Sequence, residues 1–450
     1  MKFFIRTFGC QMNVADSFWI SSALVSKGFE VTYQEKDADI ILVNTCSVRK
    51  KPEEKLYSFL GRIYPYFKKN PELIVGVGGC VAQQLGEKIW KKFPFVRLIF
   101  GTDGVPYVPQ TITRLISTPS LKISLLDFKD FYPERDIVIE EELLNNHPVA
   151  YVNIMQGCNN FCAYCIVPYT RGRQKSRHSE KVLEECKRLV DAGVKEIMLL
   201  GQNVNSYGKD KYGDGVSFED LLVKVSKIQG LKRIRFTTSH PKDISDKLIE
   251  LFGKLDNLCP AIHLPLQAGS NRILKLMGRK YLKEDYLRII DKLRKVREDI
   301  VITTDLIVGF PGEREEDFRE TLDMVKRVEF DSSFSFKYSD RPGTRAEKME
   351  PKVPEEVKSK RLKELQNIQD ELTLKSMNKL HNQTVEVLVE GRSSKQLKKG
   401  VVSFRGREPG GRVVNFLVNK EMVPSVFIGS IVNIKITEVK KHSLFGEVRK

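Results

Sequence analysis

The stretch Gly157-Cys158-Asn159-Asn160-Phe161-Cys162-Ala163-Tyr164-Cys165 places three cysteines in one short loop. Its C-x3-C-x2-C spacing lets the three thiolates face the same side of that loop. Cysteine thiolates favour iron–sulfur clusters, zinc and copper. A closed zinc site needs a fourth ligand, and the next histidine, His178, comes thirteen residues after Cys165, at the start of the following predicted helix. The loop therefore predicts an iron–sulfur cluster with one iron open to a small molecule, and zinc is the alternative.

Three further cysteines, Cys10, Cys46 and Cys80, lie far apart in the sequence but share one context. Each follows an apolar segment that is typical of a buried strand: Lys2–Thr7, Asp39–Val43 or Leu73–Val77. Helices are expected between these strands, the first from an N-cap at Asp16 to about Lys27. Such alternation indicates a parallel sheet, whose ligands gather at the carboxyl ends of the strands. We therefore expect the three cysteines to meet at one sheet edge within residues 1–117 and to hold a metal, with buried structural cysteines as the alternative.

A second unit of strands and helices follows a break in this rhythm. Residues 118–147 are acidic and punctuated by prolines, and are predicted to be a linker. Alternation returns in residues 148–375, with expected strands Val149–Met155, Glu196–Leu200, Arg233–Thr237, Ala261–Leu264, Val301–Val308 and Ser332–Tyr338. Six such units without dinucleotide-binding glycines predict a partial (β/α)6 barrel with its site at the carboxyl ends of the strands.

The end of the chain has a different character. A long polar helix from Pro354 to about Leu380 leads into an all-β tail, residues 376–445, with expected strands Thr384–Glu390, Lys399–Phe404, Val413–Val418 and Ile431–Glu438. From Ser376 onward there are 14 Lys or Arg against 6 Asp or Glu, a net charge of +8. A small basic, OB-like β-barrel is a common nucleic-acid platform. The net charge of +17 over the whole chain also favours a polyanionic partner, although a generally lysine-rich surface is the alternative.

Composition limits the remaining classes of protein. A chain of 450 residues with 41% hydrophobic content has room for two to four domains. No apolar run reaches ~18 residues and Arg6 interrupts the apolar start, so we expect no membrane span, no signal peptide and a cytoplasmic location. Eight cysteines then suit metal or redox use better than disulfides. Cys186 and Cys259 have no partners at ligand spacing and are predicted to be core or loop residues.

The residues around both sets of cysteines carry a family resemblance. The first loop and its continuation, Ile166-Val167-Pro168-Tyr169-Thr170-Arg171-Gly172-Arg173, resemble the radical S-adenosylmethionine methylthiotransferases. So do Thr7-Phe8-Gly9-Cys10-Gln11-Met12-Asn13, Asn44-Thr45-Cys46-Ser47-Val48-Arg49 and Gly79-Cys80-Val81-Ala82-Gln83. Together the four stretches are most similar to the MiaB-type tRNA methylthiotransferases. The resemblance covers nearly the whole chain, including a tail similar to the RNA-binding TRAM domain.

The resemblance implies a transferase with two [4Fe–4S] clusters and S-adenosylmethionine. The three loop cysteines would ligate the cluster that cleaves S-adenosylmethionine to a 5′-deoxyadenosyl radical. Cys10, Cys46 and Cys80 would ligate a second cluster, whose open iron carries the sulfur that a second S-adenosylmethionine methylates. The implied product is methylthiolated at C2 of N6-(dimethylallyl)adenosine at tRNA position 37, beside the anticodon. Because an aromatic C–H is not acidic, this chemistry must come from the cofactors, and no conventional catalytic side chain is expected.

The resemblance also implies contacts to S-adenosylmethionine from side chains at the ends of barrel strands. These would be Tyr164 beside the adenine, Gln202 and Asn203 at the methionine end, Ser239 and Gln267 on the ribose side, and Ile307 and Gly309 along the adenine. The alternative is that these residues only cap strands and satisfy turns. The expected partners are the anticodon stem-loop of tRNA, an electron-donor protein and a sulfur source, with no membrane contact and a monomeric chain.

Two competing functions remain open. A sister methylthiotransferase would act on N6-threonylcarbamoyladenosine in tRNA or on a ribosomal-protein aspartate. A protein of another class would bind RNA with a structural metal and catalyse nothing. Several residues also depart from the family pattern without removing a cysteine: Lys50, Pro52, Gln174, His178 and Asp340. They put contacts to the nucleotide in doubt rather than the class of reaction.

Overall fold

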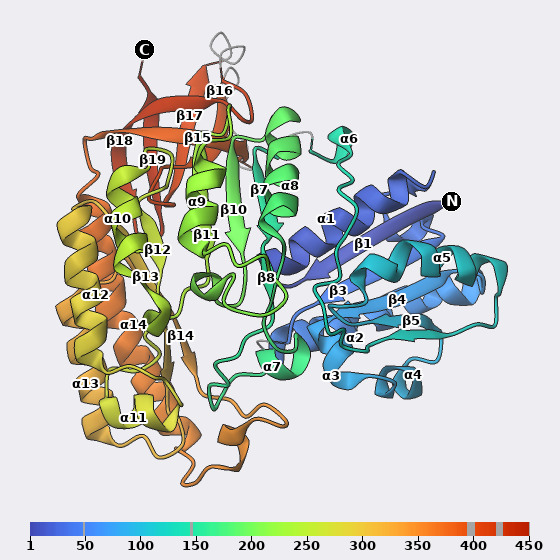
Figure 1. The fold of residues 1–450 in the computed structure, drawn as a ribbon, viewed down its shortest axis with the longest axis horizontal. Helices are drawn as coiled ribbons and strands as arrows, with labels where there is room; N and C mark the ends of the chain where they lie inside the picture. The colour runs from blue at the N-terminus through green and yellow to red at the C-terminus, as the bar shows by residue number, and fades with distance from the viewer. Residues whose placement is uncertain (48–49, 145–146, 394–400, 420–425, 450) are drawn as a thin grey trace.

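The structure is a computed structural model that describes residues 1–47, 50–144, 147–393, 401–419 and 426–449. Figure 1 shows three units: an N-terminal sheet with its helices, a central barrel beside it, and a smaller C-terminal barrel at one end of the central one. This arrangement confirms the predicted α/β fold class with its C-terminal β-barrel.

The N-terminal unit is a parallel sheet in the order β2-β1-β3-β4-β5-β6. Its strands are β1 (Lys2–Phe8), β2 (Glu30–Val31), β3 (Ile40–Thr45), β4 (Ile74–Gly79), β5 (Val96–Phe100) and β6 (Ile123–Leu125). β3 and β4 are buried along their whole length, so their apolar residues run on without alternation. One face is covered by α1 (Gln11–Val25) and α5 (Val108–Ser117), and the other by α2 (Lys50–Lys69), α3 (Cys80–Leu85) and α4 (Lys88–Lys92).

Two expectations for this part of the chain were wrong. The first helix begins at Gln11 with Cys10 as its N-cap, and Asp16 lies buried inside it rather than capping it. An interior aspartate of this kind serves a tertiary contact, which sequence reasoning mistook for a helix start. The predicted linker also contributes β6, which pairs in parallel with β5 and completes the sheet.

The central unit is the partial barrel. Its strands are β7 (Val149–Asn153), β10 (Glu196–Leu200), β11 (Arg233–Thr237), β12 (Ala261–His263), β13 (Val301–Val308) and β14 (Ser332–Lys337). They form two parallel sheets, β11-β10-β7 and β12-β13-β14, connected by a parallel bridge between Ile234 and Leu258. Among the described strands β7 and β14 do not pair, so the barrel stays open on that side. The covering helices are α8 (Ser179–Asp191), α9 (Phe218–Ser226), α10 (Asp246–Lys254), α12 (Lys283–Val296) and α13 (Glu315–Val328).

A long helix, α14 (Glu355–Asn378), leads to the C-terminal barrel. That barrel closes in the order β15-β16-β17-β19-β18. Its strands are β15 (Thr384–Arg392), β16 (Val401–Arg407), β17 (Val413–Asn419), β18 (Ile431–Lys440) and β19 (Ser443–Val448). β19 was not predicted, and the expected start of the second strand at Lys399 lies outside the described residues.

The C-terminal barrel covers the amino ends of the central strands. Arg233 Nη1 donates to the backbone oxygen of Arg407 at 2.8 Å, and Arg235 Nη2 donates to that of Glu408 at 3.0 Å. Both arginines lie in β11 and are buried. Because barrel sites lie at the carboxyl ends, this contact leaves the opposite end of the barrel to the N-terminal unit.

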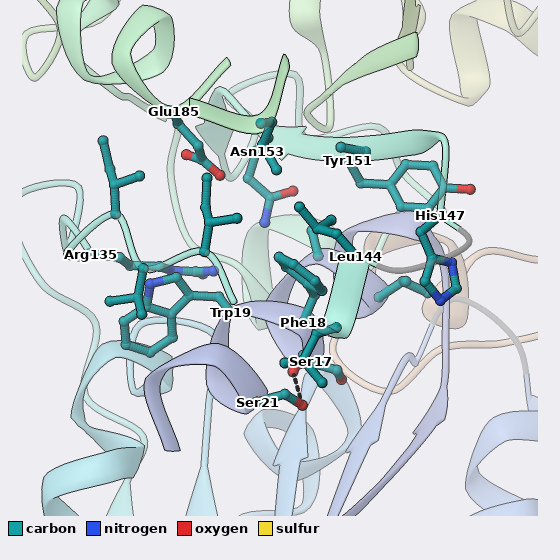
Figure 2. Close-up of a pocket in the computed structure, with 18 of the residues that line it drawn as sticks. Ser17, Phe18, Trp19, Ser21, Arg135, Leu144, His147, Tyr151, Asn153 and Glu185 are labelled. Carbon is teal, nitrogen blue, oxygen red and sulfur yellow. Dashed lines mark hydrogen bonds between the residues drawn. The ribbon is translucent and has the colours of Figure 1, made fainter. Parts of the chain in front are cut away.

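The N-terminal unit meets the central barrel along α1 and β7 (Figure 1). Asp16 accepts hydrogen bonds from Arg135 Nη2 at 2.7 Å and from Asn153 Nδ2 at 3.1 Å. Beside this contact lies a cavity of about 480 Å³. It is lined by Phe18 and Trp19 of α1 and by residues of the segment 132–139, which carries Arg135 (Figure 2). A buried carboxylate thus holds the two units together.

Replacing Asp16 with alanine is expected to lower the free energy of unfolding by about 3–5 kcal/mol, because it leaves the charge of Arg135 buried without its partner. Urea unfolding of the metal-free protein measures this. Glu250→Gln is the matched control, since its exposed pair with Lys254 should contribute less than about 1 kcal/mol. Equal losses in the two variants would show that the buried pair does not hold the units together.

Candidate functional site

The register of the N-terminal sheet brings Cys10, Cys46 and Cys80 to one edge. Phe8 of β1 pairs with Thr45 of β3, and Thr45 pairs with Gly79 of β4. Cys46 directly follows Thr45, and Cys80 directly follows Gly79. Cys10 lies two positions after Phe8. The backbone N–H of Cys46 also donates to Phe8 O at 3.0 Å. One row of the sheet therefore ends in three cysteines, as the alternation of strands and helices predicted.

Side chains beside this row fix the turns that carry the cysteines. Asn13 Nδ2 donates to Asn44 Oδ1 at 2.8 Å, and Asn44 Nδ2 donates to the Asn13 backbone oxygen at 3.0 Å. Cys10 Sγ donates to Asn13 Oδ1 at 3.3 Å. Gly79 has φ +86°, and a Cβ there would lie 2.2 Å from Thr45 O. A glycine is therefore required for the close approach of β4 to β3 before Cys80.

Electrostatics in this cluster favour anionic sulfur. Interaction with the Cys46 side chain is the largest cause that lowers the pKa of Cys10 to about 6 and that of Cys80 to about 5. These contacts and burial raise the pKa of Cys46 itself. The buried guanidinium of Arg171 lowers both depressed values further. Metals bind thiolates rather than thiols, so this donor set fits a metal centre.

The loop of Cys158, Cys162 and Cys165 is built on the first barrel strand. The Gly157 N–H donates to Gln202 Oε1 at 2.6 Å, and the Cys158 N–H donates to Gly172 O at 3.3 Å. The far side of the loop is tied to the rest of the barrel, because the Ala163 N–H donates to Met277 O at 2.8 Å. These bonds hold the loop over the carboxyl ends of the strands.

A second buried arginine serves this loop. Arg279 Nη1 lies 3.6 Å from Cys162 Sγ and donates to it, while Arg279 Nη2 donates to Pro265 O at 2.8 Å. Burial raises the pKa of Cys158, and raises that of Cys165 to about 12. Burial therefore favours the thiol form of Cys158 and Cys165, and Arg279 offsets part of the charge that metal binding would create.

The two triplets differ from a compact single-ion site. In the described residues, no three His, Cys, Asp or Glu side chains are arranged to hold one metal ion. All eight cysteines are free thiols. In an iron–sulfur cluster each thiolate ligates a different iron, so three cysteines can serve it without forming a closed single-ion site. Three thiols and one buried arginine per set fit an anionic cluster of that kind.

Of the seven residues expected to contact the cofactor, Tyr164 lies in the cysteine loop and the other six lie at the carboxyl ends of barrel strands or in the turns after them. The amide oxygen of Asn203 and the hydroxyl of Ser239 are buried, and within the described part of the chain neither has a hydrogen-bond partner. Gln267 has φ +74° and its backbone bonds β13, with its N–H on Asp305 O at 2.8 Å. Unsatisfied buried polar atoms are costly, so the first two side chains fit a site that a polar ligand completes.

The other expected contacts have partners of their own. Gln202 also contacts Met12 of α1 through its amide nitrogen, so it joins the two units. The Gly309 N–H donates to Glu313 Oε2 at 2.6 Å. Tyr164 and Ile307 are half-buried, and burial raises the pKa of Tyr164 well above its usual range. Gly309 thus also serves the turn after β13.

Sequence reasoning missed the two arginines that serve the cysteines. Arg171 lay within the quoted motif, yet no role was assigned to it. Its position six residues after Cys165 was the available signal. Arg279 lies more than a hundred residues from its cysteine, and nothing in the local sequence marks it.

A cavity of about 860 Å³ connects the second cysteine set with the inside of the barrel. Cys10 and Cys46 line it from the N-terminal unit, and Arg407 lines it from the C-terminal barrel. Its remaining walls come mostly from β10 to β14. All three units therefore border one space in which a reactant could meet the cysteines.

Three family models match the chain. They are the Radical SAM superfamily over residues 152–325, the Uncharacterized protein family UPF0004 over residues 2–101, and the TRAM domain over residues 378–448. Solved structures agree on the fold: a radical S-adenosylmethionine methyltransferase, TsrM, from Kitasatospora setae aligns with a TM-score of 0.56 at 14% identity, over 77% of this chain and 74% of its own. The fold and the matched families define a radical S-adenosylmethionine enzyme with an N-terminal UPF0004 unit and a C-terminal TRAM barrel.

Full-length relatives narrow this class. A tRNA-2-methylthio-N(6)-dimethylallyladenosine synthase of Nitratidesulfovibrio vulgaris strain Hildenborough is 53% identical over 99% of this chain and 98% of its own. A synthase of the same name from Clostridium botulinum strain Loch Maree is 46% identical over 99% of this chain and 96% of its own. The chain belongs to the family of tRNA-2-methylthio-N6-dimethylallyladenosine synthases, the MiaB-type methylthiotransferases. In the described residues, no helix has the length and apolar character needed to cross a membrane.

A buried histidine beside the expected cofactor contacts predicts a pH effect on stability. Burial, with the charge of Arg279, lowers the pKa of His240 to about 2, and its Nδ1 accepts from the Lys242 N–H. In the unfolded chain a histidine takes up a proton near pH 6.5. Below that pH only the unfolded state gains the proton, so the free energy of unfolding should fall by up to about 1.4 kcal/mol per pH unit.

His240→Gln should remove this contribution. Urea unfolding of the metal-free protein between pH 7.5 and 5.5 should then show a smaller loss of stability in the variant than in the parent. Exposed His442 gives the matched control, His442→Gln, which should keep the parent's slope. Identical slopes in all three proteins would mean that His240 is protonated in the folded state.

Proposed function

We propose that the chain is a tRNA-2-methylthio-N6-dimethylallyladenosine synthase, which methylthiolates C2 of N6-(dimethylallyl)adenosine at position 37 of tRNA. Full-length similarity to synthases of that name supports the reaction. The observation that carries it in the structure is the presence of two cysteine triplets, one at the sheet edge that borders the cavity and one in the loop over the barrel strands, each beside a buried arginine. A single metal site of structural type would need neither the second triplet nor the cavity.

We propose that Cys158, Cys162 and Cys165 hold the [4Fe–4S] cluster that binds S-adenosylmethionine. The other three cysteines would hold a second [4Fe–4S] cluster. When bound, these groups would supply the electron, the hydrogen-abstracting radical, the sulfur and the methyl group. The protein's own part is to hold the ligands as thiolates, to compensate their charge and to keep water out. Arg171 would compensate the charge of Cys10, Cys46 and Cys80, and Arg279 would do so for the loop cysteines.

The cofactor contacts follow from the same placement. Asn203 and Ser239 would offer their unsatisfied oxygen atoms to the polar groups of S-adenosylmethionine. Gln202 would fix the loop and α1 together at the methionine end, through the Gly157 N–H and Met12. Tyr164, Gln267, Ile307 and Gly309 would line the ribose and adenine. No side chain is assigned as a conventional acid or base.

The remaining partners follow from the reaction and the basic tail. The anticodon stem-loop of tRNA would contact the TRAM barrel, whose strands expose Arg405 and Lys435. An electron-donor protein and a sulfur source are needed to complete the cycle, and we expect a monomer acting in the cytoplasm. The alternatives are a threonylcarbamoyladenosine or ribosomal-protein methylthiotransferase, and a metal-containing RNA-binding protein without catalysis.

Iron content separates the enzyme from the non-catalytic alternative. After anaerobic reconstitution the parent should contain about eight irons per chain, and removing either triplet by Cys→Ala replacement should leave about four. The matched control is Cys186→Ala, since that cysteine is buried in α8 away from both sets and should not change the count. About one zinc per chain, or about four irons in the parent, would contradict two clusters.

Nucleoside mass spectrometry tests the substrate. Transfer RNA from a strain that lacks this gene should lose the 2-methylthio-N6-dimethylallyl nucleoside and accumulate its precursor without the methylthio group. Complementation with the parent should restore it, and Cys158→Ala should not. Loss of the methylthio form of threonylcarbamoyladenosine instead would assign the chain to the sister enzymes.

A further inference from the structure

The inward-facing residues of β12, β13 and β14 form one wall of the central barrel, and they include charged and aromatic side chains as well as aliphatic ones. In β13 the even-numbered residues from Ile302 to Val308 are buried under the helices, and the odd-numbered residues Thr303, Asp305 and Ile307 are only partly buried. The register pairs Asp305 with Phe334 of β14, and His263 of β12 with Thr303. Side chains paired in this way share one face, so a carboxylate, an imidazole and a phenyl ring stand together toward the lumen.

These three groups contact one another and border the cavity that reaches Cys10. His263 Nε2 lies 3.3 Å from Asp305 Oδ2, and His263 Nδ1 lies 3.0 Å from Thr303 Oγ1. The imidazole also meets the Phe334 ring edge to face, with 6.0 Å between centroids. All of them line the same cavity as Cys10 and Cys46. The proposed cofactor clusters and contacts use none of the three.

Phe334 is the least expected member of the wall. Its side chain is 53% exposed, on β14, the strand that borders the open side of the barrel. A large apolar side chain left open in a cavity indicates a place where another apolar or aromatic surface packs. The neighbouring carboxylate can accept a hydrogen bond, and the imidazole can donate or accept one.

We propose that His263, Asp305 and Phe334 bind the purine ring of the target nucleoside. This rests on the proposed function. Phe334 stacks on the ring, and Asp305 accepts from the N6–H that an N6-alkylated adenosine retains. Enzymes that modify a base commonly flip it out of its helix or loop into a pocket of this kind, where stacking and edge contacts read it.

The position of the wall suits the chemistry. Asp305 and Ile307 are two residues apart on the same face of β13, which is roughly 7 Å along the strand. Ile307 N–H bonds Gln267 O at 2.9 Å, and both residues belong to the proposed S-adenosylmethionine contacts. A base on Phe334 would therefore lie beside the radical source on one side and Cys10 and Cys46 on the other, as transfer to C2 requires.

The rest of the cavity favours an uncharged N6 substituent. Met198, Phe236 and Val301 line its inner part. Its two arginines there are paired: Arg235 bonds Glu196 at 2.9 Å, and Arg407 lies 3.1 Å from Glu390. A dimethylallyl group fits such a surface, whereas the carboxylate of a threonylcarbamoyl group would find both arginines paired, with Lys55 of the lining on the side of the N-terminal unit.

The experiment measures what the base itself adds to RNA binding. Full-length reconstituted protein is titrated, at one fixed salt concentration, with anticodon stem-loops carrying N6-(dimethylallyl)adenosine, N6-threonylcarbamoyladenosine or an abasic site at position 37. The ratio of the Kd for the abasic RNA to the Kd for the modified RNA isolates the contact to the base.

The variants are Phe334→Ala and Asp305→Asn. Phe334→Leu, which retains most of the side-chain volume, replaces the alanine variant if that variant fails to fold. Phe131→Ala and Asp246→Asn, both exposed elsewhere, are the matched controls. Unchanged iron content and melting temperature identify folded variants.

In the parent the dimethylallyl ratio should exceed the threonylcarbamoyl ratio. Loss of the aromatic ring should reduce it at least about fivefold, the usual size of one base–aromatic stack, and Asp305→Asn should reduce it as well. The controls should keep the parent's ratio. A parent ratio near one, equal ratios for the two modified RNAs, or an unchanged ratio in the folded Phe334 variants would overturn the assignment. No turnover is needed, so failure to form the methylthio product would count against the proposed reaction alone.

Discussion

Burying several thiolates in one place is the constraint on which this structure depends. Like charges in a pocket of low dielectric constant repel one another, and the pocket forms only if a positive charge is buried with them. Arg171 supplies that charge to Cys10, Cys46 and Cys80, although it belongs to the loop of the other triplet. Its guanidinium also lies 4.0 Å from Asp16, which Arg135 and Asn153 hold at the junction of the two units. The charge of Arg171 therefore affects both the contact between the two units and the protonation of the cysteines.

Direct contacts between the two units accompany this coupling, among them the buried pair of Lys175 with Asp103. Gln202 touches Met12, and the Cys10 turn is locked by Asn13 and Asn44 within its own unit. The N-terminal sheet and the barrel each position their own cysteine triplet at the ends of strands. Arg171 links the two, because it follows the loop of one triplet and interacts with the cysteines of the other. Parallel strands are suited to this, because every carboxyl end faces the same way and one row of residues can supply several ligands.

Much of this arrangement could be predicted from the sequence. Cysteine spacing indicated two sets of three. The buried strands β3 and β4 indicated a parallel sheet, because their apolar residues are continuous. The strands at Glu196–Leu200, Arg233–Thr237 and Val301–Val308 were predicted with the bounds observed. The errors came where tertiary contacts override local preference. Asp16 resembles an N-cap but pairs with Arg135 in space, and Ile123–Leu125 becomes a strand only because the edge of β5 is available. Arg279 and the wall at Phe334 could not be predicted, since their partners are set by the closing of the barrel.

The C-terminal barrel has a second consequence beyond its resemblance to an RNA-binding module. Arg233 and Arg235 bond its backbone at the amino ends of β11, and Arg407 reaches the inner cavity. The module therefore forms the base of the reaction chamber as well as extending away from it. The amino ends of the strands are therefore covered, which leaves the carboxyl-end side and the open side between β7 and β14 for the entry of reactants. Replacing this module with another would accordingly change the cavity itself, because Arg407 and Gly410 form part of its wall.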